Sequence, residues 1–516
     1  MVRVPRSYPA TRSAVKVRSP SARTMAAALP DDAVAALRCQ DCGVIDSVSA
    51  VVLAAGAASR FGGGGKLLAP LGGRPILQHV LDALAAATIE DVVVVLGDDA
   101  DAIEAAISWR TERRVRNPDP GRGLSSSVRA GLAAAARGAD AILIVLGDQP
   151  AISEEVIRRL RAAAGATDRP IVVARYAGDS ARNPVLVRPA AFTLIDEASG
   201  DRGLGPVIAA HPDLVKEVAM PGENPDVDRP EDLVAAAAAR WAARVRADRE
   251  QVERYREVPD GRDFYAPVRS IFRADPDRTD DPVLDALRAL VVPGETWLDI
   301  GAGAGRFALP LALIAGRVIA LDASAGMLDA LREDASDHAI GNVELILGRW
   351  PPDLSAPEVT AALGDFPCAD VALIAHVGYD IEAIVPFIES MEAASRRLCA
   401  AVLMDAQPGS LAAPLWPPVH GEARVILPGL NELVELLRLR GTPPDVRRLP
   451  REPRTFTDRD TLLSLVRRQL WVAEGSEKDA RLREALEPLV VEEASGVRFA
   501  VDELGGIGVV TWRGGA

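Results

Sequence analysis

The sequence predicts an α/β protein with two doubly wound domains that are joined by a helical linker. Two series of short, apolar, β-branched segments alternate with amphipathic helical stretches, and a charged helix and a turn-forming stretch separate the two series. Strands this apolar are typical of a parallel sheet that helices cover on both faces. A chain of 516 residues is also longer than one hydrophobic core usually organises. We therefore expect two sheets, each with its own core.

The first domain is expected to cover residues 46–240. A helix is predicted from Pro75 to Ala87, because proline suits the first helical position and five apolar residues share one helical face. Residues 1–45 are rich in basic side chains and are expected to form a disordered tail. The predicted strands are the apolar runs at 51–53, 92–96, 142–146 and 171–174.

The second domain is expected to cover residues 265–516, after a helical linker at 241–264. Two late segments, 496–502 and 507–512, flank a glycine-containing turn and predict an antiparallel hairpin that closes the sheet. The mainly helical stretch 429–489 exceeds what a minimal sheet needs and is expected to cap the second site. The predicted strands are 296–300, 318–321, 343–347, 370–375 and 401–404.

Composition narrows the possible partners. The formal net charge of -14 disfavours nucleic acid, because proteins that bind it usually concentrate basic side chains on one surface. Small-molecule substrates are therefore expected. The most apolar stretch, 307–321, is interrupted by Pro310 and Gly316 and is too short to cross a bilayer, so no membrane partner is expected. Four cysteines in a chain of this length do not make a disulfide framework, which favours a cytoplasmic protein.

A glycine-rich loop, AAGAASRFGGGGKLL, follows the predicted strand 51–53. Its glycines let backbone amides approach an anion, and Arg60 and Lys66 add positive charge, so the loop can hold a triphosphate. It is not a Walker A loop, because Leu67 follows Lys66 where that loop has a Ser or Thr to hold magnesium. A metal must therefore be bound by other residues.

Carboxylates in two later segments are the candidate metal ligands. Asp148 follows the strand 142–146 in LGDQP, which places it at the carboxyl edge of the sheet, where open α/β sheets bind ligands. Asp226 and Asp228 in NPDVDRPEDL offer a second carboxylate. A bound triphosphate concentrates negative charge, so a reaction at its phosphates needs metal and cationic groups more than a protein nucleophile.

Six segments between about residues 49 and 240 resemble the MobA-like nucleotidyltransferases in their order. They are LAAGAASRFGGGGKLL, GRGLSSSVRAGL, LGDQP, ARNPVLV, GDRGLG and DVDRPEDL. LGDQP is most similar to the molybdenum-cofactor cytidylyltransferase branch. The resemblance implies Mg²⁺-dependent transfer of CMP from CTP to a phosphorylated acceptor, molybdopterin carrying molybdenum, with release of pyrophosphate. An NAD(P)H-dependent oxidoreductase remains an alternative, because some MobA-like relatives act on redox pigments.

The resemblance also implies roles for individual residues. Lys66 and Arg60 are expected to bind the triphosphate and to act with Asp148 in catalysis, while Asp148 and Asp228 bind the metal. Arg182 and Asn183 are expected to face the acceptor. The chain departs from the family pattern in its four consecutive glycines and in Arg229, which replaces the usual threonine. The expected nucleotide-binding residues are Leu53, Ala54, Ala55, Gly56, Arg60, Lys66, Ser125 and Ser126.

A second glycine turn, DIGAGAGRF, follows the predicted strand 296–300 and contains Gly301, Gly303 and Gly305. Such a turn binds the edge of an adenosine-containing cofactor in several folds. A dinucleotide fingerprint would need a small residue at Arg306, so a methyl donor without pyrophosphate fits better. The next strand, 318–321, ends in Asp322, which is placed to accept hydrogen bonds from two ribose hydroxyls.

These residues resemble motif I and the following acidic position of class I methyltransferases, over about residues 265–514. The resemblance implies a seven-stranded Rossmann-like sheet with a terminal antiparallel hairpin, and S-adenosyl-L-methionine as cofactor. It places Asp299 and the glycine turn at the methionine portion, Asp322 at the ribose, and Ala323 and Met327 near the adenine.

The surroundings of the methyl acceptor are less defined by the sequence. Trp350 is expected to stack on the adenine, because Arg349 replaces the acid that often contacts it. His376 or Tyr379 is expected to line the acceptor pocket. AHVGYD lacks the NPPY-like turn of base methyltransferases, which favours a small-molecule acceptor. The sequence thus predicts a bifunctional transferase, and the alternative is that one half only binds nucleotide or S-adenosylmethionine.

Overall fold

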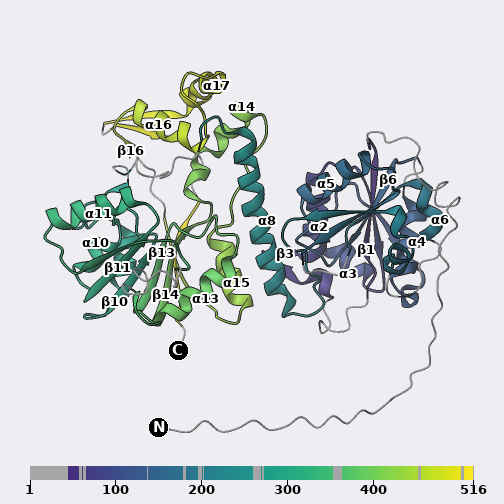
Figure 1. Ribbon diagram of the computed structural model, residues 1–516, viewed down its shortest axis with the longest axis horizontal. Helices are drawn as coiled ribbons and strands as arrows, with labels where there is room; N and C mark the ends of the chain where they lie inside the picture. The colour runs from purple at the N-terminus through teal and green to yellow at the C-terminus, as the bar shows by residue number, and fades with distance from the viewer. Residues whose placement is uncertain are drawn as a thin grey trace, which may run out of the picture.

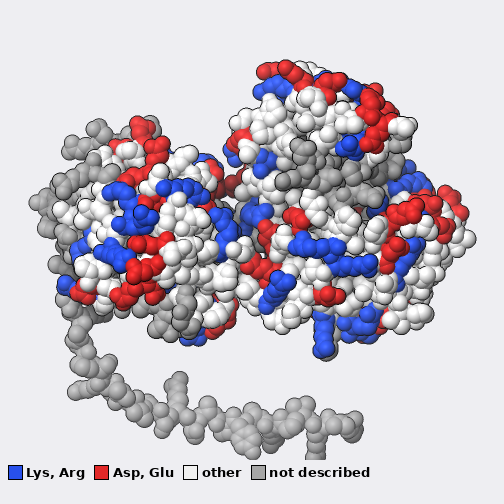
Figure 2. All heavy atoms as spheres, turned by 180° about the vertical axis from the view of Figure 1, so that it is seen from behind, with Lys and Arg blue, Asp and Glu red and all other residues white. Residues whose placement is uncertain are grey.

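The computed structural model describes residues 45–56, 61, 65–135, 138–177, 182–195, 200, 203–259, 269, 272–352, 363–450, 455–494, 496–500 and 505–514. It contains two separate seven-stranded sheets, each flanked by helices, with the long helix α8 between them (Figure 1). The predicted α/β class with two Rossmann-like domains is therefore confirmed. Nearly all of the predicted tail, residues 1–44, lies outside the described residues. On the face shown in Figure 2, basic and acidic side chains are interspersed over both domains.

The first sheet has the strand order β5-β4-β1-β6-β8-β7-β9. β8 runs antiparallel to both of its neighbours, and the other neighbouring strands are parallel. All four strands that the sequence predicts are present. The bounds are β1 Val48–Ala54, β4 Asp91–Leu96, β5 Arg113–Arg116, β6 Ala141–Leu146, β7 Ile171–Tyr176, β8 Val185–Val187 and β9 Val215–Met220.

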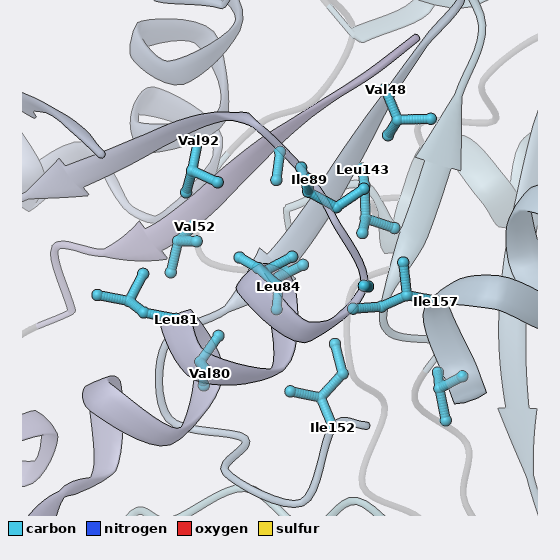
Figure 3. Packing of buried hydrophobic residues seen from close by; sticks show 14 of the residues in the cluster. Val48, Val52, Val80, Leu81, Leu84, Ile89, Val92, Leu143, Ile152 and Ile157 are labelled. Atoms are coloured by element: carbon cyan, nitrogen blue, oxygen red, sulfur yellow. The ribbon is translucent and has the colours of Figure 1, made fainter. Parts of the chain in front are cut away.

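Helices cover both faces of this sheet, which explains why its central strands are apolar on both sides. On one face α2 and α5 pack on the sheet: Leu81 and Leu84 of α2 lie beside Val52 of β1, and Ile157 of α5 belongs to the same cluster (Figure 3). On the other face α4 approaches so closely that a Cβ added at Gly131 would lie 2.2 Å from Val51. The bounds are α2 Ile76–Ala86, α3 Ala100–Ala106, α4 Leu124–Ala134, α5 Glu154–Gly165, α6 Phe192–Ile195 and α7 Gly205–Ala210.

The second sheet has the order β12-β11-β10-β13-β14-β19-β15. Its first five strands are parallel, and β19 lies antiparallel between β14 and β15. All five predicted parallel strands are present. The bounds are β10 Thr296–Ile300, β11 Arg317–Asp322, β12 Val343–Leu347, β13 Ala369–Ala375, β14 Ser395–Met404, β15 Asp445–Leu449 and β19 Ile507–Arg513; the flanking helices are α9 Pro282–Arg288, α10 Ala308–Ala312, α11 Ala325–Asp337, α13 Ile384–Ala394 and α15 Leu430–Leu439.

The predicted pairing of the closing hairpin is wrong. β18 (Gly496–Phe499) lies in a separate three-stranded sheet between β16 (Thr455–Phe456) and β17 (Val490–Glu493), whereas β19 pairs with β14 and β15. The glycines of the predicted turn serve a different contact. The N–H of Asp405, which follows β14, donates to the carbonyl of Gly506 at 3.0 Å, and the N–H of Gly506 donates to Asp405 Oδ2 at 2.7 Å. A Cβ on Gly506 would lie 3.0 Å from the same Oδ2. The glycines therefore allow β19 to enter the sheet rather than to turn back on β18.

A small subdomain lies beyond the end of the second sheet, at the edge where β10 and β11 end (Figure 1). It combines α14 (Trp416–His420), α16 (Arg459–Gln469) and α17 (Glu477–Leu486) with the three-stranded sheet, and it has its own apolar cluster. The stretch 429–489, predicted as a cap, is thus divided, because α15 packs on the main sheet while α16 and α17 belong to this subdomain.

Helix α8 (Asp232–Tyr255) contacts three parts of the molecule in succession. Ala236 packs in an apolar cluster on the first domain, Trp241 in the core of the second, and Val252 in the cluster of the small subdomain. Trp241 also donates from Nε1 to the carbonyl of Ile381 at 2.9 Å. The predicted linker, 241–264, therefore begins inside a helix that packs on the second domain. Among the described residues, no helix is long and apolar enough to cross a membrane.

Candidate active sites

Three side chains that are distant in the sequence meet at the carboxyl edge of the first sheet. Lys66 opens the 3-10 turn η1 (Lys66–Leu68), Asp148 follows β6, and Asp228 precedes α8. The Lys66 ammonium donates to Asp148 Oδ2 and, at 2.8 Å, to Asp228 Oδ1. Burial lowers the pKa of Lys66, but the two carboxylates outweigh burial, so its pKa lies above the usual value and the ammonium stays charged. Both carboxylates thus converge on a single cation.

Asp226 occupies a different position from Asp228. Its Oδ1 accepts a hydrogen bond from Gln149 Nε2 at 2.9 Å, and Gln149 in turn accepts one from Asn224 at 3.3 Å. Burial and the nearby charge of Asp148 raise the pKa of Asp226 to about 6. The structure therefore brings Asp228 rather than Asp226 to Lys66. Sequence reasoning missed Gln149 as a positioning residue, although its place beside Asp148 in LGDQP was a usable signal.

The loop that carries Asp228 is held from both sides. The backbone N–H of Val227 donates to the carbonyl of Asp148 at 3.0 Å. Asp232, the first residue of α8, accepts hydrogen bonds from the backbone N–H groups of Asp228 at 2.9 Å and Arg229 at 2.8 Å. A carboxylate at a helix N-terminus is favourable there, because the exposed N–H groups carry partial positive charge. The start of α8 therefore sets the position of the Asp228 carboxylate.

The predicted nucleoside side of the pocket lies at the start of α4. Asn117, which follows β5, donates from Nδ2 to Ser126 Oγ at 2.8 Å and to Ser127 Oγ at 3.0 Å. Ser125 is buried beside them. The sequence analysis did not single out Asn117, because an asparagine after a short charged strand has no distinctive local pattern. These contacts hold the serine turn in one arrangement at the sheet edge.

The remaining predicted residues of the first site fall into three groups. Leu53 and Ala54 are buried at the end of β1. Ala55 packs against Gly97, because a Cβ on Gly97 would lie 2.8 Å from the Ala55 carbonyl oxygen. Gly56 is exposed at the carboxyl edge, and Arg60 lies outside the described residues. Arg182 pairs with Glu217 of β9 at 2.9 Å. Asn183 is followed by Pro184 and then by the first residue of β8.

The second site is built around the glycine turn after β10. All three glycines have φ in the left-handed region, at 74° for Gly301, 55° for Gly303 and 84° for Gly305. A Cβ on Gly301 would lie 2.4 Å from Val377, and one on Gly305 would lie 2.9 Å from Leu309, so these two glycines allow close packing. A Cβ on Gly303 would meet nothing within 4 Å. Gly303 thus leaves open space beside the backbone, as a bound cofactor would require.

Asp322 ties this turn to the start of α11. Its Oδ2 accepts a hydrogen bond from the N–H of Gly303 at 2.8 Å, and its Oδ1 accepts one from the N–H of Ser324 at 2.8 Å. Ser324 caps α11 by accepting from the N–H of Met327 at 3.1 Å. Met327 is buried, and Ala323 is exposed at the edge of the sheet. Carboxylate oxygens retain acceptor capacity after one bond each, so Asp322 can also receive hydroxyl donors.

Asp299 is a buried carboxylate inside β10, with 2% of its surface exposed. Burial and the charge of Asp322 raise the pKa of Asp299 to about 7. Its Oδ1 has no hydrogen-bond partner among the described residues. A buried carboxylate without a donor is costly, and a cationic ligand group removes that cost. Asp299 is therefore a buried carboxylate that a cationic group of a ligand would stabilise.

We expect Asp299→Asn to stabilise the ligand-free protein at alkaline pH and to weaken binding of S-adenosylmethionine. With the pKa raised from 3.8 to about 7, the wild-type free energy of unfolding falls as pH rises between these values. The reason is that the folded state keeps a proton that the unfolded state has lost, at about 1.4 kcal/mol per pKa unit. The asparagine amide cannot ionise, so the variant does not lose this stability.

Thermal unfolding at about pH 5 and about pH 8 checks this prediction, because the stabilisation by Asp299→Asn should be clearly larger at the higher pH. Calorimetric titration with S-adenosylmethionine measures the expected loss of affinity. Asp337→Asn, on the exposed end of α11, is the matched control. Unchanged affinity in Asp299→Asn would show that this carboxylate does not meet the cofactor.

The residues predicted around the methyl acceptor lie near the end of β13. His376 has an unusual φ of 59°, and its Nδ1 lies 3.4 Å from the Tyr379 hydroxyl, which accepts from the N–H of Met404 at 2.8 Å. Strained backbone of this kind is common at functional sites. Trp350 is buried and stacks on Phe366 with ring centroids 6.0 Å apart, so one of its faces is already covered.

Both domains thus place carboxylates at the carboxyl edge of a doubly wound sheet, as enzymes that bind nucleotides and adenosine cofactors do. Residues 50–215 match the family model of the MobA-like NTP transferase domain, and residues 298–363 match that of a methyltransferase domain. The chain therefore carries a nucleotidyltransferase-like domain followed by a methyltransferase domain, and it belongs to the MobA-like NTP transferase family through the first.

Several known proteins are similar to the first domain. Nicotine blue oxidoreductase of Paenarthrobacter nicotinovorans is 33% identical over 197 residues, which are 36% of this chain and 94% of that protein. The bifunctional protein GlmU of Sinorhizobium medicae is 36% identical over 132 residues, which are 25% of this chain and 29% of GlmU. This chain therefore spans less than a third of the length of that relative.

Solved structures are similar to each half of the chain. The crystal structure of Rv0371c from Mycobacterium tuberculosis is 31% identical, with 37% of this chain and 96% of that chain covered, at a TM-score of 0.34. YcgJ of Bacillus subtilis is 14% identical, with 45% of this chain and 98% of that chain covered, at a TM-score of 0.32.

Proposed function

We propose that the first domain is a magnesium-dependent nucleotidyltransferase that uses CTP. It transfers CMP to a terminal phosphate of an acceptor such as molybdopterin carrying molybdenum. An acceptor oxygen forms a bond to the α-phosphorus, the bond from that phosphorus to the bridging oxygen breaks, and pyrophosphate leaves with the electron pair. The convergence of Asp148 and Asp228 on Lys66, which follows the glycine-rich stretch in the sequence, carries this proposal.

The residues of the first site suit this chemistry. Asp148 and Asp228 would hold Mg²⁺, which when bound supplies a Lewis acid for the charge that develops on the phosphates. Their two carboxylates already converge on one cationic group, the Lys66 ammonium. Lys66 stays protonated and can neutralise a phosphate oxygen, while the turn at Ser125 and Ser126 faces the nucleoside. The site thus acts by positioning and charge stabilisation rather than by a protein nucleophile.

We propose that the second domain methylates a small molecule with S-adenosyl-L-methionine as methyl donor. The unpartnered Asp299 oxygen, the open space at Gly303 and the Asp322 carboxylate support this assignment, because they match the ammonium, the methionine backbone and the ribose hydroxyls in turn. The chain's own residues orient the donor and exclude water, and proximity supplies much of the rate in such reactions.

We expect CTP to be preferred over GTP in a magnesium-dependent pyrophosphate-release assay with the purified full-length protein. The expectation rests on LGDQP, which resembles the cytidylyltransferase branch. Kinetics with each nucleotide and molybdopterin carrying molybdenum provide the measurement. Equal or faster release from GTP would overturn the choice of CTP.

An NAD(P)H-dependent oxidoreductase is the second candidate for the first domain. One observation favours it: nicotine blue oxidoreductase of Paenarthrobacter nicotinovorans is similar to this chain over 94% of its own length. Calorimetric titration separates the two candidates, because a nucleotidyltransferase binds CTP with Mg²⁺, whereas an oxidoreductase retains NADPH. Binding of either ligand without turnover would instead indicate a domain that only senses it.

We propose small molecules as the partners of both domains, in a cytoplasmic protein. The net charge of -14 and the interspersed charges on the described surface in Figure 2 support partners other than nucleic acid. Nucleotide, S-adenosylmethionine and their acceptors are all of this class.

A further inference from the structure

The hairpin that follows Lys66 reaches across to the second domain. Its strands are β2 (Pro70–Leu71) and β3 (Arg74–Pro75), and β3 lies beside α8 in Figure 1. The turn glycines, Gly72 and Gly73, have φ of 63° and 71°, as a tight two-residue hairpin turn requires. The N–H of Gly72 donates to the Glu435 carboxylate of α15. This contact joins residues that are 363 positions apart.

Side chains of α8 and α15 lie next to Gly72. A Cβ on Gly72 would lie 3.6 Å from Arg240 Nη1 and 3.7 Å from Glu435 Oε2. Burial lowers the pKa of Arg240 to about 10, but the guanidinium remains charged at neutral pH beside Glu435. The hairpin tip is therefore held between an arginine of α8 and a glutamate of α15.

An apolar cluster under the hairpin links the same elements. Leu71 of the hairpin and Val227, the residue between the two site aspartates Asp226 and Asp228, are both fully buried in it. Leu439 of α15 packs against this cluster from the second domain. The cluster thus links two of the chain segments that carry first-site residues, those of Lys66 and Asp228. Its buried members are Ala69, Leu71, Ile76, Val227, Leu233 and Ala236.

Helix α15 is itself fixed on the second domain. Arg440 makes two hydrogen bonds with the Glu392 carboxylate, both at 2.9 Å, and Trp512 Nε1 donates to the same carboxylate at 3.0 Å. At its other end, Glu432 pairs with Arg244 of α8. The bidentate contact of Arg440 and the Trp512 hydrogen bond, both to the Glu392 carboxylate, give α15 a defined position. The second domain therefore presents Glu435 and Leu439 from a rigid support.

We propose that α15 of the second domain is part of the framework that positions Lys66 in the first site, with Glu435 and Leu439 as positioning residues. Glu435 holds the tip of the hairpin that follows η1, and Leu439 closes the apolar cluster beneath it. Together they set where the Lys66 ammonium lies relative to the triphosphate. The inference rests on the proposed binding of a nucleotide at the first site, and it makes that site dependent on the methyltransferase domain.

Two variants of α15 test this in the full-length protein. Glu435→Ala removes the acceptor for Gly72, whereas Glu435→Gln keeps an amide oxygen that can accept the same hydrogen bond. The matched controls are Arg438→Ala on the exposed side of α15 and Glu484→Ala on the exposed surface of α17. Each variant is titrated with CTP and Mg²⁺ and separately with S-adenosylmethionine, and hydrogen–deuterium exchange is measured over residues 65–76.

We expect Glu435→Ala to raise the Kd for CTP by at least about fivefold, because it removes a hydrogen bond to a charged group and only part of that free energy reaches the nucleotide through Lys66. Glu435→Gln and both controls should stay within about twofold of wild type. Exchange over 65–76 should become faster only in Glu435→Ala. The Kd for S-adenosylmethionine should stay within about twofold of wild type in all variants. A general loss of structure would raise this Kd as well, so the measurement separates it from a local effect on the first site.

Unchanged CTP binding and unchanged exchange over residues 65–76 in Glu435→Ala would overturn the inference. If the wild-type protein binds neither CTP nor GTP, the proposed function of the first domain fails. The exchange measurement still decides whether Glu435 holds the hairpin, since it needs no nucleotide. The two failures are therefore distinguishable.

Discussion

Asp148→Asn is expected to lower the rate of nucleotidyl transfer by about 10²- to 10³-fold, the usual effect of removing one preorganised electrostatic group from an active site. The substitution keeps the shape of the side chain but removes a charge that Lys66 contacts and that a magnesium ion would need. Lys66 would then pair only with Asp228, which is about half exposed, with 53% of its side chain accessible. Both the metal and the ammonium would be held less firmly.

Pyrophosphate release at saturating CTP measures this effect, and calorimetry with S-adenosylmethionine provides the second readout. Asp213→Asn, on an exposed 3-10 turn before β9, makes the same chemical change away from the site and should behave as wild type. Binding of S-adenosylmethionine should be unaffected, because Asp148 lies in the first domain. A loss of that binding as large as in Asp322→Ala would indicate a shared or interdomain site instead of two separate ones.

Asp322→Ala is expected to weaken S-adenosylmethionine binding by at least about tenfold while nucleotidyl transfer stays unchanged. Its carboxylate accepts backbone hydrogen bonds from Gly303 and Ser324, both at 2.8 Å, so its removal loosens the glycine turn as well as the ribose contact. Hydrogen bonds to a charged group contribute roughly 1.5 to 3 kcal/mol each, and tenfold in affinity corresponds to about 1.4 kcal/mol.

Calorimetric titration of Asp322→Ala with S-adenosylmethionine checks this prediction. Asp337→Ala removes an exposed carboxylate from the other end of α11 and is the matched control. An affinity within about threefold of wild type would contradict a role of Asp322 in cofactor binding, because it corresponds to less than one such hydrogen bond.

The strands of both sheets were predictable because their signal is local. β10 has the predicted bounds, since an apolar run that helices cover on both faces lies between Gly294 and Gly301. The apolar face of α2 was predictable for the same reason, because the five apolar residues predicted to share it are all buried: Ile76, Leu77, Val80, Leu81 and Leu84. Local periodicity reports burial, and burial defines these elements.

Strand pairing at the end of the second sheet was not predictable in the same way. The segments at β18 and β19 have the pattern of a hairpin, yet β19 pairs with β14, which is about a hundred positions earlier in the chain. Alternation of apolar residues specifies which face of a strand is buried, but it does not specify the neighbour. The pairing of β19 with β14 involves a close approach of Gly506 to Asp405, which exists only in the folded chain.

The sequence by itself determined the two domains, their sheets and the residue types at each glycine turn, because these depend on short-range patterns and on ordered motifs. The family resemblance already favoured Asp228, but only the tertiary structure shows that Asp228 reaches Lys66 while Asp226, two positions earlier, reaches Gln149. The tertiary structure also decided the contact of Glu435 with Gly72. A glutamate on a helix has the same local pattern whether it faces water or another domain, so such contacts emerge only when the chain has folded.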